Sequence, residues 1–258
     1  MLIKYDREFP NATGHYIDIA ATQLGIEVIT DLEAQADVIL NIDSCSKYAY
    51  SREGVPSFYW ETDSWYPRER ILGFDKQTRI FYGGCLDDGI RYPANAIYLP
   101  LAADINLHRP IPVEKKYDIV MIGRTGGEYT ERDRVINLLK SKYNIYVGET
   151  EAGIPYSTAM SKGKLILHRS VTDFNIGMRF FEGMAIGTLI ANYIEGMNLL
   201  ATPFMHYIPF RNDKELVENI DYYLSHPKEV NRIAVKSQAL VMEKHTYINR
   251  LLEILFYL

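Results

Sequence analysis

The segment from Met178 to Gly187, read as MRFFEGMAIG, places two ionisable side chains one helical turn apart in an otherwise apolar stretch. Arg179 stands near the start of the predicted helix, where a cation opposes the helix dipole. That position is easier to understand if Arg179 faces an anion such as a diphosphate. Glu182 either pairs with Arg179 at i,i+3 or accepts hydrogen bonds from the hydroxyl groups of a ligand.

The residues that lead into this helix also suit an anion. The free N–H groups of a helix N-terminus, together with its dipole, favour negative charge, and Gly177 lets a ligand approach the backbone. The candidate binding residues in this loop are Asn175, Ile176, Gly177 and Met178.

A second glycine-rich loop, Gly123 to Gly127, follows a predicted strand and precedes a predicted helix. Gly123 and Thr125 would expose backbone amides to a phosphate, and Arg124 would add a fork of donors with a fixed charge. The loop matches neither the G-x-G-x-x-G fingerprint nor the P-loop, so a plain structural turn stays open as the alternative.

Two further loops carry groups that could accept a proton from a hydroxyl. His15 closes the loop after the first predicted strand, and Asp63 lies in the loop after Trp60. A general base must lie within hydrogen-bond reach of the proton that it removes, which makes both residues catalytic candidates. Their neighbours are also typical of caps and turns, and that structural interpretation stays open.

Composition narrows the class of protein. With 258 residues and a net charge of -5, the chain is long enough for two small domains and lacks the basic surplus typical of nucleic-acid binding. Cys45 and Cys85 are too few for a disulfide framework, and no Asp or His cluster suggests a metal. The sequence shows neither a bilayer-spanning apolar run nor a signal peptide, so we expect a cytoplasmic protein.

The elements that must position these residues alternate between short apolar runs and helical patterns, which is typical of βαβ units and a parallel sheet. In the first half we expect a helix over Tyr16 to Leu24 and about six strands: Leu2 to Tyr5, Glu27 to Thr30, Ala36 to Ile42, Pro56 to Trp60, Arg79 to Tyr82 and Ala96 to Leu99.

The stretch from Asp104 to Lys116 contains two prolines and no periodicity, which indicates a linker. Beyond it the βα rhythm restarts. We expect strands over Tyr117 to Ile122, Asn144 to Val147, Lys164 to Leu167 and Thr188 to Asn192, and helices over Glu131 to Lys142, Tyr156 to Lys162, Phe180 to Ala185, Lys214 to Ser225 and Pro227 to Leu258, the last with a break near Thr246.

The predicted organisation is therefore two α/β domains, 1–107 and 108–240, followed by a C-terminal helix, 241–258, that packs back on the first domain. Two such sheets present the carboxyl ends of their strands to a central cleft, where open α/β sheets bind ligands.

Several ordered motifs resemble one known family. The segment Arg179 to Gly187 resembles the R-x-F-E-A-M-A-x-G segment of CgeB-like members of glycosyltransferase group 1. Other pieces resemble this family in matching order, over roughly Asn95 to Arg250: Tyr98 to Asp104 (YLPLAAD), Tyr117 to Arg124 (YDIVMIGR), Tyr156 to Leu167, and His245-Thr246-Tyr247 with Arg250.

The resemblance implies a GT-B fold with two Rossmann-like domains, and a metal-independent, retaining transfer from a nucleoside-diphosphate sugar. By carry-over, Glu182 accepts from the ribose hydroxyls and the loop Asn175 to Met178 offers backbone amides to the donor. Arg179, Arg124 and Lys164 are candidate countercharges, since stabilising a departing diphosphate is the main electrostatic task without a metal. Tyr156 begins another donor-side motif.

The sequence also departs from the family pattern. Phe174 stands where the wider family of retaining enzymes has a second glutamate, and Asn175 is the candidate substitute. His168 stands where the resemblance predicts asparagine.

Two other function classes stay open: a nucleotide-sugar-binding protein that does not transfer, and a nucleotide-sugar epimerase. In each, the expected partner is a nucleotide sugar. For a transferase, the acceptor could be a glycan, a small molecule, a protein or a modified nucleic acid.

Overall fold

The structure is a computed structural model, and it describes residues 1–5, 7–8, 12–42, 49–62, 74–84 and 96–258. The chain divides into two compact units. Unit 1 combines Met1–Leu101 with Tyr247–Leu258, and unit 2 is Ala102–Thr246. The predicted domain boundaries after residues 107 and 240 stay predictions, and each unit is described below by itself.

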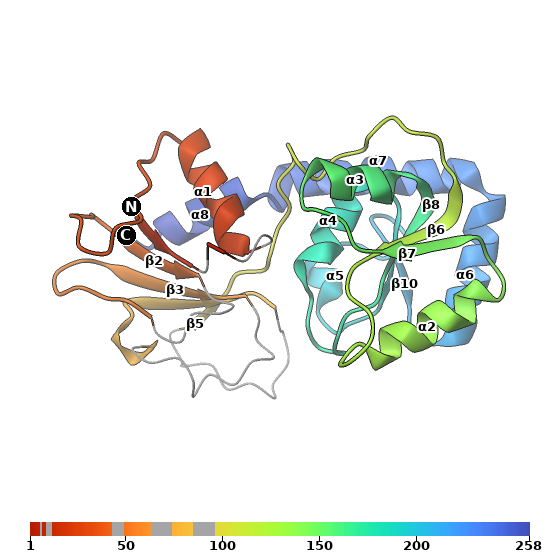
Figure 1. Cartoon of the computed structure of the whole chain (residues 1–258), viewed down its shortest axis with the longest axis horizontal. Helices are drawn as coiled ribbons and strands as arrows, with labels where there is room; N and C mark the ends of the chain where they lie inside the picture. The colour runs from red at the N-terminus through yellow and green to blue at the C-terminus, as the bar shows by residue number, and fades with distance from the viewer. Residues whose placement is uncertain (6, 9–11, 43–48, 63–73, 85–95) are drawn as a thin grey trace. The chain divides into compact units, whose positions relative to one another are not determined.

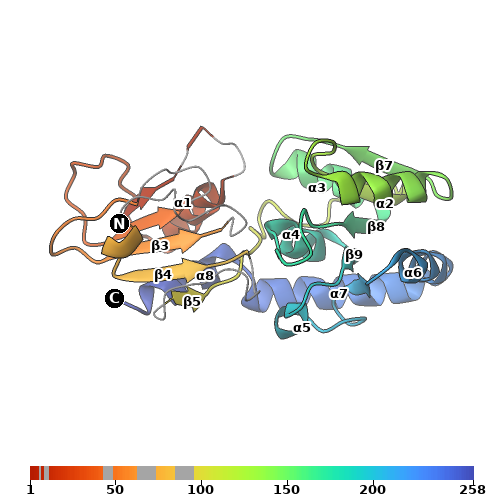
Figure 2. The same cartoon turned by 90° about the horizontal axis from the view of Figure 1, so that it is seen from below.

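Unit 1 contains a five-stranded parallel sheet in the order β1-β2-β3-β4-β5. Figure 2 shows β3 and β4 side by side in it. The bounds of its elements are β1 Leu2–Lys4, α1 Thr13–Gln23, β2 Ile39–Ile42, β3 Ser57–Glu61, a 3-10 turn at Phe74–Lys76, β4 Arg79–Tyr82, β5 Ala96–Tyr98 and α8 Tyr247–Leu255.

The core of unit 1 depends on both ends of this unit. Helices α1 and α8 lie against the same face of the sheet (Figure 1), and the rings of Tyr16 and Tyr247 stack with centroids 5.0 Å apart. The guanidinium Nε of Arg250 donates to the carbonyl of Pro100 over 2.6 Å. Trp60, which is fully buried, donates to the carbonyl of Leu99. These contacts fasten α8 and the end of β5 to the sheet.

Unit 2 contains a second parallel sheet, in the order β10-β9-β8-β6-β7. Figure 1 shows α3 and α7 on one face of this sheet and α2 and α6 on the other. The bounds of its elements are β6 Tyr117–Ile122, α2 Thr130–Lys140, β7 Ile145–Gly148, α3 Ile154–Ser161, β8 Gly163–His168, α4 Met178–Ile186, β9 Leu189–Asn192, α5 Met197–Leu200, β10 Ile208–Phe210, α6 Asp213–Ser225 and α7 Pro227–Lys244.

The sequence explains why these segments form a doubly wound layer structure. The central strands are near-continuous apolar runs, as strands covered on both faces require, and the last four residues of β6 are all buried. Asn212 caps helix α6, because its side chain accepts from the backbone N–H of Glu215, and α7 begins with Pro227. One core cluster joins residues of α2, α6 and α7 to the sheet.

Most predicted elements are confirmed, and β4 and β6 have the predicted bounds. The prediction of a strand over Glu27 to Thr30 is wrong: Ile29 forms only an isolated bridge to Leu2. The described part of unit 1 therefore has five strands rather than about six. Helix α5 and strand β10 were not predicted. The break near Thr246 is confirmed, because α7 ends at Lys244 and α8 starts at Tyr247.

Candidate functional site

The strand order of unit 2 identifies where its sheet can hold a ligand. In chain order, β6 to β10 follow the doubly wound pattern 2-1-3-4-5, so the direction of winding reverses between β6 and β8. The loops after these two strands diverge to opposite faces, and the crevice at such a switch point is the usual ligand site of the fold. Gly123 and Arg124 follow β6, and Arg169 follows β8.

The structure brings Arg179 directly over Gly123. A Cβ atom built on Gly123 would lie 3.0 Å from the guanidinium carbon of Arg179, and the φ angle of Gly123 is +148°. Only glycine adopts that angle readily and leaves the necessary space. The loop after β6 and the start of α4 therefore lie side by side in unit 2.

The N-terminus of α4 is open. Gly177 is the N-cap residue, and no side chain caps the first turn. Within the described residues Arg179 has no carboxylate partner, so the predicted alternative of an intrahelical pair with Glu182 is not what the structure contains. An uncapped helix N-terminus beside a partly exposed, unpaired guanidinium is suited to an anion.

The site holds more positive charge than sequence reasoning suggested. Arg132 of α2 is 2% exposed, and its Nη1 donates to the carbonyl of Arg124 over 2.5 Å. Its Nε and Nη2 both donate to the carbonyl of Arg169, over 3.1 and 3.0 Å. Burial, and then the neighbouring charge of Arg179, lowers the pKa of Arg132 to about 10. The charge of Arg169, in contrast, is balanced by a carboxylate, because Arg169 pairs with Asp173 over 2.8 Å.

Three buried polar atoms around this crevice have no hydrogen-bond partner among the described residues. They are Nε2 of His168 at the end of β8, Oδ1 of Asn175 before α4, and Nδ2 of Asn192 at the end of β9. Burial and the charges of Arg132, Arg179 and Arg169 hold the pKa of His168 well below its ordinary value, so the ring is neutral. Buried polar atoms are normally paired, and three together point to a polar ligand.

Glu182 contacts a residue that sequence reasoning missed. Its Oε1 lies 3.4 Å from Nε2 of His108, and both side chains are buried. Nδ1 of His108 accepts from the backbone N–H of Asp104, so a neutral ring carries its proton on Nε2, the nitrogen that lies 3.4 Å from Glu182. The ring of Tyr156 packs edge-on against His108, with centroids 5.9 Å apart. The linker thus orients Glu182, which retains acceptor capacity for a ligand.

The remaining predicted donor-binding residues are Lys164, Arg124, Thr125, Ile176 and Met178. Lys164 lies at the start of β8, at the opposite end of the strand from the crevice, and its Nζ pairs with Asp118 over 2.8 Å. Arg124 and Thr125 are exposed in the loop after β6. Ile176 is buried and Met178 partly buried, on either side of Gly177. Lys164 is therefore left out of the site proposed below.

The two predicted proton acceptors belong to unit 1. Asp63 lies outside the described residues. His15 is in α1, and its Nδ1 lies 3.0 Å from the hydroxyl of Tyr5. That hydroxyl donates to Oδ2 of Asp18 over 2.6 Å, and an ionised carboxylate can only accept. Tyr5 has a single hydroxyl proton, so His15 donates to it from Nδ1.

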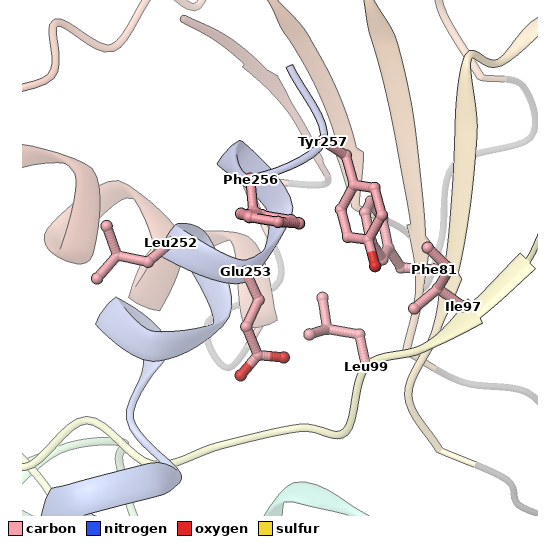
Figure 3. Close-up of a pocket in the computed structure, with 7 residues that line it drawn as sticks. All are labelled: Phe81, Ile97, Leu99, Leu252, Glu253, Phe256 and Tyr257. Atoms are coloured by element: carbon pink, nitrogen blue, oxygen red, sulfur yellow. The ribbon is translucent and has the colours of Figure 1, made fainter.

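A cavity of about 340 Å³ lies in unit 1, between the edge of the sheet and α8 (Figure 3). Its lining is almost wholly apolar, and it holds none of the predicted site residues. Its one carboxylate, Glu253, is paired with Arg250 over 3.0 Å. The polar chemistry of unit 2 is therefore separate from this cavity.

Within the described residues, no group of three or more His, Cys, Asp or Glu side chains is arranged to hold a metal ion. In the same part of the chain, none of the helices is both long and apolar enough to cross a membrane.

Sequence reasoning missed Arg132, Arg169 and His108. A signal for Arg132 was present, since it shares one helical face with Val135, Ile136 and Leu139, all of which are buried. Its burial on that face could have been inferred. His108 had no such signal in an aperiodic linker.

The fold is shared with solved glycosyltransferases. Anabaena HepE in complex with UDP and glucose is 13% identical, with a TM-score of 0.69 over 99% of this chain and 98% of that chain. A glycosyltransferase from Rickettsia africae is 11% identical, with a TM-score of 0.63 over 99% and 96%. The DNA-modifying enzyme β-glucosyltransferase is 14% identical, with a TM-score of 0.59 over 100% and 97%. The two Rossmann-like halves thus define the GT-B type.

The family can also be stated. The profile of the family described as glycosyl transferase-like matches residues 106–255, more than half of the chain. The protein therefore belongs to the glycosyl transferase-like family, and it is a glycosyltransferase. None of the curated proteins matches the sequence.

Proposed function

We propose that this enzyme transfers a sugar from a UDP-sugar to a hydroxyl group of an acceptor, with the donor held in unit 2. One observation carries the proposal: the open N-terminus of α4, the unpaired Arg179 and three orphaned buried polar atoms lie around one switch-point crevice. This combination suits a ligand that has both a diphosphate and hydroxyl groups.

Uridine is the nucleoside that the solved relatives favour. HepE structures contain UDP, or UDP-glucose, and the β-glucosyltransferase structure was determined in the presence and absence of uridine diphosphoglucose. Identities of 13 to 14% transfer the fold rather than the ligand, so uridine is part of the proposal.

The site suggests a division of labour among its residues. Arg179 and the amides of Gly177 and Met178 hold the diphosphate, with Arg124 as a further countercharge. Glu182, oriented by His108, accepts from the ribose hydroxyls. Oδ1 of Asn175, which has no partner among the described residues, accepts a hydrogen bond from a hydroxyl of the sugar. It takes the place of the glutamate that the family pattern has at Phe174. Gly123, Thr125, Tyr156 and Ile176 complete the donor site.

In the transfer step, the acceptor oxygen forms a bond to the anomeric carbon of the sugar on the same face from which the diphosphate leaves. The bond from that carbon to the diphosphate oxygen breaks, and its electron pair leaves with the diphosphate. Arg179 stabilises the developing charge without a metal. The acceptor proton passes to His15 or to Asp63. We propose a retaining outcome, which NMR of the anomeric proton in the first product formed would test.

The central test is nucleotide binding. We expect UDP and UDP-glucose to raise the melting temperature of the wild-type enzyme, because a ligand that binds only the native state stabilises it. GDP, ADP and TDP sugars serve as comparisons. Glu182→Ala and Arg179→Ala should each weaken the UDP response. If no nucleotide stabilises the wild type, the proposal fails.

Turnover separates the remaining function classes. Slow release of free sugar from UDP-glucose, or transfer to a hydroxyl acceptor, supports a transferase. Tight UDP binding without turnover over a broad acceptor panel would select a binding protein instead, a reading that Phe174 motivates. A new UDP-sugar formed from donor alone would select an epimerase. We also propose that the enzyme belongs to the CgeB-like subgroup and that it is located in the cytoplasm.

A further inference from the structure

Arg132 is a buried cation whose hydrogen bonds are all to neutral groups. It is 2% exposed, and within the described residues its N–H groups donate only to the carbonyls of Arg124 and Arg169. Its guanidinium carbon also lies 4.5 Å from the centroid of the Tyr129 ring. Within the described residues it forms no ion pair. The charge of the nearby Asp133 favours the cation, but burial and the charge of Arg179 outweigh it and lower the pKa of Arg132. A buried cation that is not fully compensated is costly, and such an arrangement calls for another reason to exist.

The two carbonyls that Arg132 binds lie on the two sides of the switch point. Arg124 is in the loop after β6, and Arg169 follows directly after β8. Only a guanidinium has donors in a fixed planar fork that can hold two carbonyls at once. Arg132 therefore ties together the loops whose divergence opens the crevice.

The charge of Arg132 also acts on the crevice. Arg179 and Arg169 help to lower its pKa, and Arg132 in turn helps to lower the pKa of His168, so these groups lie close enough to influence one another. Of the three arginines, Arg169 is balanced by Asp173. Arg132 and Arg179 leave an excess of positive charge at the end of β8.

We infer that Arg132 is a positioning residue for the donor diphosphate: it braces the β6 and β8 loops and supplies buried positive charge that the diphosphate compensates. The inference rests on the proposed function, since it assumes a diphosphate at the crevice. Arg132 itself is covered by the loops. It acts on the ligand by holding these loops in place and through its electrostatic field. Its removal should weaken binding of the diphosphate and leave binding of the nucleoside unchanged.

The experiment compares two substitutions with a matched control on the same helix. Arg132→Gln removes the charge and the fork, whereas Arg132→Lys keeps the charge and loses the fork. Arg134→Gln is the control, because Arg134 is about half exposed and pairs with Glu131 and Asp213. Binding of UDP is measured by calorimetry and binding of uridine by ligand-observed NMR, for each variant at low and at high salt.

We expect Arg132→Gln to bind UDP at least tenfold more weakly, with uridine within twofold of the wild type and a smaller salt dependence of UDP binding. Arg132→Lys should fold, restore the salt dependence, and still bind UDP severalfold more weakly. Arg134→Gln should behave as the wild type.

Two results would overturn the inference: an equal loss of UDP and uridine binding, which indicates a purely structural role, or wild-type UDP binding by Arg132→Lys. If Arg132→Gln does not fold, UDP binding and uridine binding of Arg132→Lys alone test the inference. A wild-type enzyme that binds no UDP would instead reject the donor site itself, so the two failures are distinguishable.

Discussion

Nε2 of His108 lies 3.4 Å from Oε1 of Glu182, and a neutral His108 ring carries its proton on this nitrogen because Nδ1 accepts from the backbone of Asp104. A residue of the linker thus fixes the orientation of the carboxylate that the family motif places in the donor site. Both side chains of the pair are buried, so losing one partner leaves the other poorly compensated.

His108→Phe should therefore destabilise the protein by about 2 kcal/mol or more, because it leaves a buried carboxylate without its polar neighbour. Urea unfolding followed by circular dichroism measures this change. Glu182→Gln is the companion variant, and the double variant should cost less than the sum of the two. Simple additivity would show that the pair is not coupled.

Arg179→Ala should have opposite effects on ligand binding and on stability. Removing a cation from the first turn of α4 relieves its repulsion with the helix dipole, worth about 0.3–1 kcal/mol. The ligand-free variant should therefore melt no lower than the wild type, while its affinity for UDP falls at least tenfold. A variant that melts lower and binds UDP normally would contradict this assignment.

Gly123→Ala should displace Arg179, whereas Gly126→Ala should not. Both glycines have positive φ angles, +148° and +77°, so both substitutions strain the backbone. Only at Gly123 would the new methyl group lie against the Arg179 guanidinium; nothing lies within 4 Å of it at Gly126. We expect both variants to be destabilised and only Gly123→Ala to lose UDP affinity, as isothermal titration calorimetry would show.

His168 should make stability depend on pH. Its pKa in the folded state is lowered by burial and by three arginines, so below pH 6.5 the unfolded chain binds a proton that the folded chain resists. The stabilising contribution of the neutral ring is present above pH 6.5 and is lost as the pH falls toward the folded pKa, by up to about 1.4 kcal/mol per pH unit.

His168→Asn should remove this part of the pH dependence between pH 6.5 and 5, measured by urea unfolding at a series of pH values. His206→Asn is the matched control, because the pKa of His206 is also lowered, but in a less buried setting. Equal slopes for wild type and His168→Asn would show that the ring is not held neutral.

Tyr5→Phe should affect catalysis through the tautomer of His15. Without the hydroxyl, Nδ1 of His15 loses its acceptor, and the proton is free to move to Nε2. We expect a lower kcat with an unchanged KM for the donor, and a changed ring nitrogen spectrum in NMR. A changed spectrum with normal kcat would remove His15 from the transfer step but keep the tautomer assignment.

The sequence predicted the elements with strong local signals. Strands β4 and β6 are apolar runs bounded by turn residues, so their limits could be read directly. Strand β10 was missed because it is three residues long and contains Pro209, which a sheet tolerates at an edge such as this one. The segment Glu27 to Thr30 has β-branched residues, yet only Ile29 reaches a partner strand.

The site was predictable only in part, for a related reason. Gly123, Asn175 and Arg179 each stand at the end of a predicted strand or the start of a helix, where ligands bind in α/β folds. The partners that orient them come from elsewhere: Arg132 lies in a helix whose first turn is highly charged, and His108 in a linker. Their proximity arises from tertiary packing, which no local pattern contains.

The composition of unit 1 from both ends of the chain, with Tyr16 stacked on Tyr247, has a consequence for biosynthesis. A ribosome synthesises residues 102–246 before helix α8, so the sheet of unit 1 lacks the cover of α8 until this helix has emerged. Until then Tyr16 lacks its stacking partner, and the carbonyls of Pro100 and Leu101 lack the hydrogen bonds that Arg250 donates. The half that is made first is thus completed last, and nascent chains shorter than full length should expose it to chaperones and proteases.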